Sequence, residues 1–478
     1  MKRSRLLLAP PAWALILVAA WPASAGAQTQ ARSDLPEGWQ PAAPREEIRP
    51  TITFLATGGP DGAGAFLIAT DDGIGQHGWV QKTFPVTGGK TYRFLAQRKT
   101  VNVESPRRSA PARIVWRDER GKLVPADVPA ESEQAGRPVP TAEPEHPPEA
   151  ATDAHGWTTL TGRYRAPSRA TQAVVELHLQ WAPKAQAYWG LARFEECEPV
   201  PPRTVRLAAI HHRPTGKGPR ANCEEFAPLI AEAARNGADL VVLGETVHYV
   251  GLGKKPHEVA EPIPGPSTEY FSGLAKKHGT HIVVSLYERD GRLVYNVALL
   301  IGPDGRIIGK YRKVCLPHSE IEAGVMPGND YPVFDTKFGK VGMMVCYDGF
   351  FPEVARELSR RGAEIIAWPV WGCDPLLAPA RANENRVVIV SSTYMDVKAK
   401  WMLSAIYDRD GTVLAAADTW GTFVMAEVDL NARRIGPYNL GDFRAMVHRH
   451  RPVPPAEAAL PAPAPATEKP SGPAQNRP

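Results

Sequence analysis

Cysteine and the common metal-binding spacings are scarce in this chain. Only 5 of its 478 residues are cysteine, and no Cys-x-x-Cys or His-Glu-x-x-His spacing occurs. Such spacings bring thiolates or imidazoles around one ion, so the sequence gives no indication of a metal site, and we expect no cofactor. Because the number of cysteines is odd, at least one thiol stays unpaired within a monomer. The one disulfide that we consider joins Cys197 to Cys223.

Strong net charge and long apolar runs are also lacking. The formal net charge is +5, and so small a balance gives no argument for a nucleic-acid partner. Beyond the first 27 residues no apolar run approaches the about 20 residues that a membrane helix needs, so we expect no stable membrane span. Residues 1–27 begin with Lys2, Arg3 and Arg5, continue as an apolar run and end on small residues. This order is typical of a secretory signal peptide and predicts an exported protein, periplasmic or secreted.

A cysteine directly follows a short apolar run in the second half of the chain. Residues 341–345 predict a buried strand, Cys346 comes next, and Pro352 begins a helical pattern. In open α/β sheets ligands bind at the carboxyl ends of strands, where backbone N–H groups of the following turn stabilise negative charge. Cys346 is therefore a candidate nucleophile. The alternative is an inert cysteine in the core.

Two other segments of the chain provide an acid and a cation that suit this nucleophile. The run 238–243 leads to Glu245, and the basic segment 309–313 ends at Lys313. A thiol with a pKa of about 8.5 needs a base to remove its proton and a cation to stabilise the charge that develops. Glu245 suits the first role and Lys313 the second, although each is also acceptable as a solvated surface residue. Four histidines leave a Cys–His dyad open as an alternative: His211, His212, His248 and His318.

Several short sequence motifs follow one another between residues 203 and 440. They are the strand that ends at Glu245, Lys310–Lys313, Pro327–Gly342, Cys346–Asp348 with Phe351–Glu353, and Arg381–Asn385. This order resembles the carbon–nitrogen hydrolase family, also called the nitrilase superfamily. The resemblance implies that Glu245 is the general base, that Lys313 stabilises the tetrahedral intermediate, and that Cys346 forms a thioester acyl-enzyme. It also implies an oxyanion donor in the backbone N–H of Tyr347, and a homodimer or larger homo-oligomer.

Family members also have a second glutamate after the lysine, and this chain offers two candidates. Counting forward from Lys313 and back from Pro327 favours Glu322 over Glu320. The chain departs from the family pattern at two positions. The family often has His where Cys315 stands, and Pro where Gly244 precedes the base. Neither position donates a group to the mechanism described above.

Strand and helix patterns alternate along residues 203–440. Apolar runs at 205–210, 281–286 and 296–301 predict strands, and the stripe of apolar residues from Phe226 to Ala233 predicts a helix. Alternation of this kind predicts a layered α/β fold. The family resemblance adds a four-layer αββα sandwich, the nitrilase-like fold.

Residues 50–200 carry short strand patterns with no helical period between them. The clearest are 91–96, 112–116, 173–179 and 188–194, which predict an all-β sandwich or jelly roll after a linker at 28–49. This pattern of short strands and turns resembles galactose-binding-like and carbohydrate-binding-module domains, and the resemblance implies a glycan partner. Five tryptophans suit sugar stacking, although the core is expected to hold most of them: Trp79, Trp116, Trp157, Trp181 and Trp189. Two segments are rich in proline. We expect 125–151 to be a mobile loop that leaves the sandwich, and 451–478 to be a disordered tail.

Together these observations predict an exported hydrolase of non-peptide carbon–nitrogen bonds that acts on a small amide. The triplet Cys346–Asp348 looks more like amidases and carbamoyl hydrolases than like nitrilases, which tend to have Cys-Trp-Glu. The alternatives are a nitrilase, an acyl transferase with the same thioester, and a non-enzymatic glycan-binding protein on a hydrolase scaffold.

Overall fold

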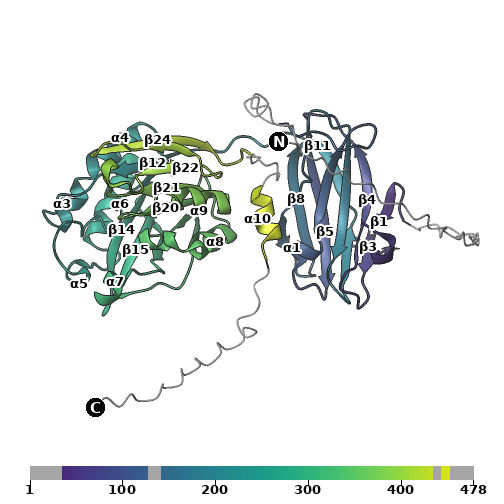
Figure 1. Ribbon diagram of the computed structural model, residues 1–478, viewed down its shortest axis with the longest axis horizontal. Helices are drawn as coiled ribbons and strands as arrows, with labels where there is room; N and C mark the ends of the chain where they lie inside the picture. The colour runs from purple at the N-terminus through teal and green to yellow at the C-terminus, as the bar shows by residue number, and fades with distance from the viewer. Residues whose placement is uncertain (1–34, 128–140, 434–442, 453–478) are drawn as a thin grey trace, which may run out of the picture.

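The computed structural model describes residues 35–127, 141–433 and 443–452. Figure 1 shows an all-β body near the N-terminus and a larger α/β body, joined by one connecting segment, with helix α10 (Phe443–His450) between them. Within the described residues, no helix combines the length and apolar character needed to cross a bilayer. The expected signal peptide, residues 1–27, lies outside the described residues.

In the described residues, the all-β body consists of two facing antiparallel sheets. The first has the order β1 (Trp39–Ala42), β4 (His77–Pro85), β9 (Gln172–Gln180) and β6 (Ala112–Arg117). The second has the order β2 (Thr51–Leu55), β3 (Ala65–Ala69), β10 (Gln186–Gly190), β5 (Thr91–Val101), β8 (Thr158–Arg165) and β7 (Glu149–Thr152), with β11 (Arg193–Cys197) also paired to β5. A short helix, α1 (Pro106–Ser109), precedes β6.

Alternation along the strands fills the space between these sheets. In β5 the side chains of Tyr92, Phe94 and Ala96 are buried while that of Arg93 is exposed, as the two-residue period of a strand requires. Trp116 and Trp189 are fully buried, whereas Trp181 keeps 54% of its surface exposed. The core therefore takes two of the five tryptophans considered for sugar stacking and leaves Trp181 at the surface.

The boundaries of this body differ from the sequence prediction at two places. Its first strand, β1, begins within the expected linker 28–49, because the Trp39 ring packs at 4.8 Å from Phe66 in the core. The expected excursion 125–151 is partly built into the sandwich, since β7 pairs with β8 and Glu145 forms a bridge with Ile114. Residues 128–140 of that segment lie outside the described residues.

The α/β body holds two further sheets in the described residues. One has the order β16 (Ile307–Arg312), β15 (Leu293–Ile301), β14 (His281–Asp290), β13 (Leu240–Val242), β12 (Thr204–His211) and β24 (Thr422–Asp429), with β17 (Val325–Met326) beside β15. The other has the order β18 (Val333–Asp335), β19 (Lys340–Met343), β20 (Ile365–Pro369), β21 (Val388–Ser392), β22 (Ala405–Tyr407) and β23 (Val413–Ala416).

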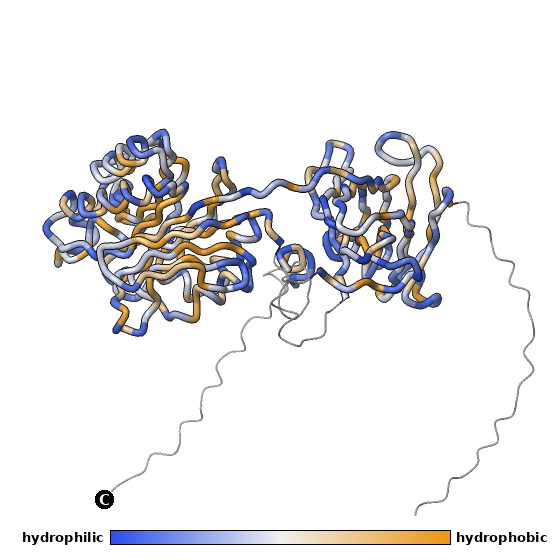
Figure 2. Tube along the Cα trace, turned by 90° about the horizontal axis from the view of Figure 1, so that it is seen from above, coloured by the Kyte–Doolittle hydropathy of each residue, from blue (hydrophilic) through white to orange (hydrophobic). Residues whose placement is uncertain are grey.

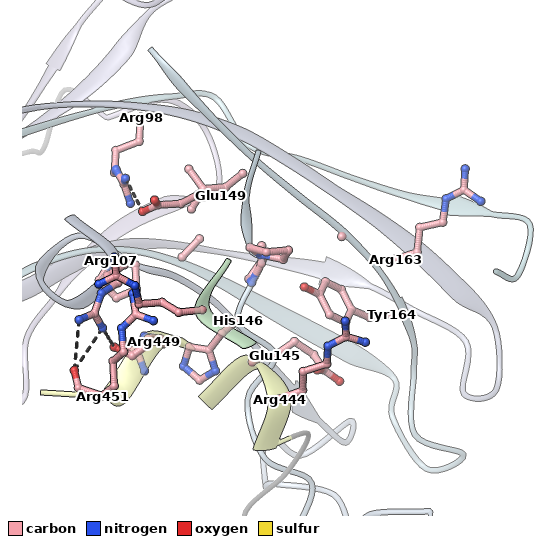
Figure 3. Close-up of a pocket in the computed structure, with 18 residues that line it drawn as sticks. Arg98, Arg107, Glu145, His146, Glu149, Arg163, Tyr164, Arg444, Arg449 and Arg451 are labelled. Atoms are coloured by element: carbon pink, nitrogen blue, oxygen red, sulfur yellow. Dashed lines mark hydrogen bonds and ion pairs between the residues drawn. The ribbon is translucent and has the colours of Figure 1, made fainter. Parts of the chain in front are cut away.

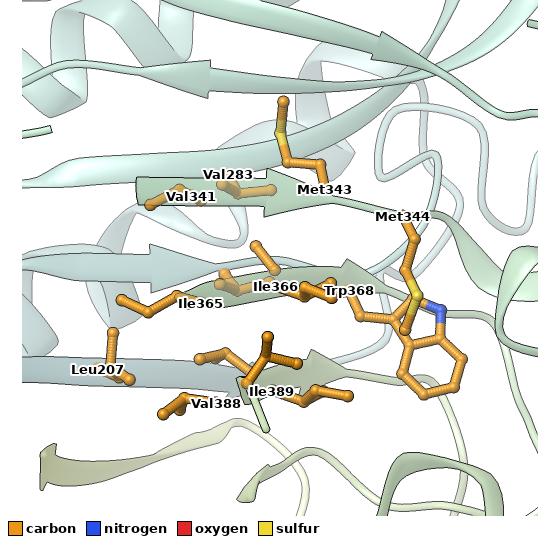
Figure 4. Close-up of a cluster of buried hydrophobic side chains, with 14 of the residues drawn as sticks. Leu207, Val283, Val341, Met343, Met344, Ile365, Ile366, Trp368, Val388 and Ile389 are labelled. Carbon is orange, nitrogen blue, oxygen red and sulfur yellow. The ribbon is translucent and has the colours of Figure 1, made fainter. Parts of the chain in front are cut away.

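These two sheets pack face to face and carry helices on their outer faces. Leu207 and Val283 of the first sheet meet Val341, Ile366 and Ile389 of the second in one fully buried cluster (Figure 4). The helices are α3 (Pro219–Glu224), α4 (Ala227–Arg235) and α6 (Pro266–His278) beside the first sheet, α8 (Pro352–Arg360) and α9 (Leu377–Asn385) beside the second, and the short α5 (Pro256–Val259) and α7 (His318–Glu322). Figure 2 shows the apolar strands enclosed by this more polar shell. The arrangement agrees with the αββα layers that the resemblance implies.

Candidate active site

The residues proposed for catalysis each follow the end of a strand. Glu245 comes after β13, Lys313 directly follows β16, and Cys346 opens the 3-10 turn η2 (Cys346–Phe350) after β19. All three line one cavity of about 350 Å³, together with Glu320, Tyr287 and Trp371. The four candidate histidines are all described by the structure, and none of them lines this cavity, so none forms a Cys–His dyad with Cys346 there.

A buried ammonium between two carboxylates forms the centre of the site. Lys313 is 1% exposed, and its Nζ donates to Oε1 of Glu245 at 2.9 Å and to Oε2 of Glu320 at 2.7 Å. Burial alone would lower the pKa of Lys313, but Glu245, the Cys346 sulfur and Glu320 together raise it above its usual value. Lys313 is therefore held as a cation inside the cavity.

The second glutamate of this cluster is Glu320, which corrects the expectation of Glu322. The two residues lie on the same short helix, α7, but point in different directions. Glu320 is buried and accepts hydrogen bonds from Lys313, Asn296 and Tyr287. The Glu322 side chain is 67% exposed and pairs with His318 at the surface. Residues two apart on a helix lie on different faces, so counting along the sequence could not decide between them.

Asn296 links the two glutamates, and sequence reasoning assigned it no role. Its Nδ2 donates to Oε1 of Glu245 at 2.8 Å and to Oε1 of Glu320 at 2.7 Å. Its own carbonyl O accepts from the Lys313 N–H at 2.8 Å. One amide thus orients both acids and the segment that carries the lysine. The available signal was a single buried amide within the otherwise apolar run of β15.

The cysteine is in a resting thiol form that requires a base. Burial raises the pKa of Cys346 well above its usual value, the Glu245 charge raises it further, and Lys313 opposes both. The Sγ atom lies 3.9 Å from the carbonyl O of Gly372. A thiol in this state reacts as a nucleophile only as its proton is removed, and the Glu245 carboxylate is positioned in the same cavity.

The backbone around the cysteine is held in an uncommon conformation. Cys346 has φ of +40°, in the left-handed region that non-glycine residues seldom adopt. Its carbonyl O accepts from Nε1 of Trp368 at 3.2 Å, and Nε of Arg381 donates to the carbonyl O of Gly349 at 3.1 Å. Tyr347, the expected source of an oxyanion N–H, follows within η2.

Asp348 ties the cysteine turn to the lysine segment. Its Oδ2 accepts from the Val345 N–H and from the Tyr311 hydroxyl, both at 2.8 Å, and its Oδ1 accepts from the Cys315 N–H at 2.8 Å. Burial raises the pKa of Asp348 to about 6, although the N–H donors of Cys315 and Val345 oppose that shift. The carboxylate thereby fixes two strand ends relative to each other.

The comparisons with known proteins concern this α/β body. A sequence model of the carbon–nitrogen hydrolase family matches residues 206–436. A nitrilase of Pyrococcus abyssi is 39% identical over 196 residues, which cover 39% of this chain and 74% of that protein. The chain belongs to the carbon–nitrogen hydrolase family. The resemblance stated above is therefore confirmed, and the protein is a carbon–nitrogen hydrolase.

Two other proteins of this family are similar to the chain at lower identity. The human omega-amidase NIT2 is 32% identical over 232 residues, covering 44% of this chain and 83% of that protein. The crystal structure of Saccharomyces cerevisiae Nit3, described as a member of branch 10 of the nitrilase superfamily, is 28% identical with a TM-score of 0.43, covering 47% of this chain and 90% of that one. The family model leaves the all-β body unmatched, so its resemblance to carbohydrate-binding modules stays a prediction.

The departure of this carbon–nitrogen hydrolase at Gly244 has a structural reason. A Cβ at Gly244 would lie 2.5 Å from the Tyr394 ring, which is too close for any side chain. The Tyr394 hydroxyl donates to the carbonyl O of Glu245 at 2.8 Å. The tyrosine thus occupies the space next to Glu245 and holds its backbone. Glycine at position 244 and tyrosine at 394 are a matched pair.

All five cysteines of the hydrolase, each within the described residues, are free. The considered disulfide between Cys197 and Cys223 is therefore absent. Cys197 ends β11 in the all-β body, whereas Cys223 is buried in α3 and contacts the Ser267 hydroxyl at 3.7 Å. Burial raises the pKa of Cys315 to about 12, so that residue also stays a thiol.

Proposed function

We propose that this protein hydrolyses a small, uncharged carboxamide through a thioester on Cys346. The observation that supports this most strongly is the arrangement of Lys313 between Glu245 and Glu320 in the cavity that also contains the Cys346 thiol. A base, a fixed cation and a nucleophile in one enclosed site are the requirements of acyl transfer.

In the first half-reaction Glu245 removes the thiol proton as Sγ of Cys346 attacks the amide carbonyl carbon. The carbonyl oxygen becomes an oxyanion, stabilised by the Lys313 ammonium and the Tyr347 backbone N–H. The C–N bond then breaks, Glu245 gives its proton to the departing nitrogen, and ammonia or an amine leaves. Glu320 and Asn296 position Lys313 and Glu245 throughout, because they hold both through the hydrogen bonds described above.

In the second half-reaction a water molecule attacks the thioester. Glu245 takes one proton from the water, the carbon–sulfur bond breaks, and the proton passes to the cysteine sulfur as the carboxylic acid leaves. The thiol and the Glu245 carboxylate are thereby restored. An amine in place of the water would complete an acyl transfer, and a nitrile in place of the amide would first give a thioimidate.

The charge balance of the cavity favours an uncharged acyl group. Among the described residues that line it, Lys313 is the sole cation, and two carboxylates already pair with it. A substrate carboxylate would enter next to two glutamates with no cation left to bind it, and an unpaired buried charge is costly. Tyr249, Tyr287 and Trp371 provide aromatic surface instead.

The test is a turnover assay on matched substrates. Butyramide and succinamic acid have acyl chains of similar length, and only the second carries a carboxylate. We expect a kcat/KM at least tenfold higher for butyramide, and lower rates for butyronitrile and for transfer to hydroxylamine. Preference for succinamic acid would reject the uncharged acyl group, and release of acid from the nitrile alone would reject the amidase. Export of the protein stays a prediction, which a secretion assay of the full chain would test. Glycan binding by the all-β body also stays a prediction, which a glycan-binding assay of the full chain would test.

A further inference from the structure

A second cavity, separate from the one at Cys346, lies where α10 meets the all-β body. Its volume is about 630 Å³, within the range of pockets that bind small organic molecules. Figure 3 shows the labelled side chains that surround it. Three parts of the chain contribute to its wall. They are the all-β body, through β5, α1, the start of β6, residues 145–149 and β8; the last turn of α8; and the C-terminal segment 444–451.

The wall is strongly basic. It contains seven arginines and only two glutamates. The arginines are Arg98, Arg107 and Arg163 from the all-β body, Arg360 from α8, and Arg444, Arg449 and Arg451 from the C-terminal segment. Such a concentration of guanidinium groups at one cavity, in a chain with a small net charge, is not expected from composition.

Both glutamates of the wall are already paired. Glu149 binds Nη2 of Arg98 at 2.6 Å, and Glu145 accepts two hydrogen bonds from Arg433, at 2.9 and 2.8 Å. Two of the remaining arginines pair with acids outside the cavity wall, Arg360 with Glu357 and Arg444 with Glu364. Within the described residues, no carboxylate pairs with Arg449 or Arg451. The cavity therefore has an excess of positive charge next to these two side chains.

Docking of the helix accounts for only part of this cluster. The guanidinium of Arg107 donates to the carbonyl O of Arg449 at 2.7 Å and to that of Arg451 at 3.2 Å (Figure 3). These bonds fasten the C-terminal end of α10, where a cation is favourable. They use the backbone carbonyls of Arg449 and Arg451, so the guanidinium groups of those two residues take no part in them.

The polar groups of the wall show the effect of this crowding. Burial, followed by the nearby Arg113, lowers the pKa of Arg449 to about 10. Burial and the charges of Arg449 and Arg113 lower the pKa of His146 to about 2. Nε of Arg449 and Nδ1 of His146 are buried and have no hydrogen-bond partner among the described residues. A buried polar atom without a partner costs about 1–3 kcal/mol.

We propose that this cavity binds a small organic anion with two or more phosphate or carboxylate groups, held by Arg107, Arg449 and Arg451. The planar guanidinium fork matches both kinds of oxyanion in a bidentate manner. Several converging arginines favour a multiply charged ligand over a single carboxylate. The volume of about 630 Å³ exceeds what one inorganic phosphate fills, and Tyr164, Pro147 and Pro148 line the cavity with carbon surface for an organic portion.

The experiment is calorimetric titration of the full chain at low ionic strength with pyrophosphate, citrate, inorganic phosphate and acetate. We expect saturable binding of pyrophosphate or citrate, at least tenfold tighter than that of acetate, and weaker in added NaCl. Whichever of the two binds more tightly identifies phosphate or carboxylate as the preferred group. Arg451→Gln leaves the backbone carbonyl that Arg107 binds and should raise Kd at least fivefold, as should Arg449→Gln.

The matched control is Arg120→Gln, because Arg120 is 76% exposed and pairs with Glu119 away from this cavity. Its Kd should equal that of the unmodified protein. Circular dichroism and the Tm of each variant show whether it is folded. The proposal is overturned if none of the four anions gives saturable heat. It is equally overturned if both folded variants of the cavity bind as the unmodified protein does, or if Arg120→Gln weakens binding as much as they do.

Discussion

Replacing Glu320 by glutamine tests the architecture of the active site without changing its size. Glu320 accepts hydrogen bonds from the Lys313 ammonium, the Asn296 amide and the Tyr287 hydroxyl, at 2.7, 2.7 and 3.2 Å. A carboxylate accepts at both of its oxygens, whereas the amide of glutamine has one accepting oxygen and one donating NH₂. In Glu320→Gln that NH₂ would face either Lys313 or Asn296, both of which are donors. One charge-assisted bond is therefore lost.

The magnitude follows from the value of such a bond. A hydrogen bond to a charged group contributes about 1.5–3 kcal/mol, which corresponds to roughly a 10- to 150-fold loss in kcat/KM if Lys313 and Glu245 lose their positions in the transition state. The matched control is Glu322→Gln, two residues further along α7. Its side chain is 67% exposed and pairs only with His318 at the surface, an interaction worth about 0–1 kcal/mol at most.

The assay measures kcat and KM of both variants on the amide that the unmodified protein turns over fastest, together with their Tm. We expect kcat to fall in Glu320→Gln and both parameters to stay within twofold in Glu322→Gln. Equal losses in the two variants, or full activity in a folded Glu320→Gln, would refute the assignment of Glu320 to the site.

Two further predictions concern the thiol and the glycine next to the base. The pH dependence of the rate at which iodoacetamide labels Cys346 should have its midpoint above pH 9, because burial and then Glu245 raise the thiol pKa. Glu245→Gln removes the negative charge, so the midpoint should move to lower pH. An unchanged or higher midpoint would contradict the effect of Glu245 on the thiol pKa. Gly244→Ala should lower the Tm, since its Cβ would lie 2.5 Å from the Tyr394 ring and overpacking costs about 1–3 kcal/mol. The matched control is Gly273→Ala in α6, where the added Cβ would have no atom within 4 Å apart from its chain neighbours and the backbone of its own helix. A Tm that falls equally in both variants would reject the steric argument.

The sequence allowed good prediction of those site residues that directly continue a strand pattern. Glu245 and Cys346 each follow an apolar run, and the end of such a run indicates where the next side chain emerges from the sheet. Lys313 instead ended a basic segment, which gave a weaker signal. Asn296 was harder, because its role depends on the distance from β15 to two acids that are far away in the sequence. Glu320 could not be separated from Glu322, since the direction of a five-residue helix is set by its packing and not by its sequence.

The domain boundaries were less predictable for a similar reason. The strand β1 became visible only through the contact of Trp39 with Phe66, which joins residues far apart in the chain. The segment 188–194 read as one strand but forms two, β10 and β11, which both pair with β5. Helix α10 lies in a segment rich in arginine, and the Arg107 side chain of the all-β body binds its C-terminal carbonyls. Each of these features depends on tertiary contacts that local patterns do not encode.

The proposed reaction passes through a thioester on Cys346. Intact-protein and peptide mass spectrometry of a rapidly acid-quenched reaction with butyramide measures this directly. We predict an added mass equal to the butyryl group on the peptide that contains Cys346, formed and lost at rates that account for turnover, and absent in Cys346→Ala, which should be inactive. Turnover of butyramide by Cys346→Ala would contradict this mechanism. So would a Cys346 peptide that carries no butyryl group while the protein without substitutions turns over butyramide at a rate limited by deacylation.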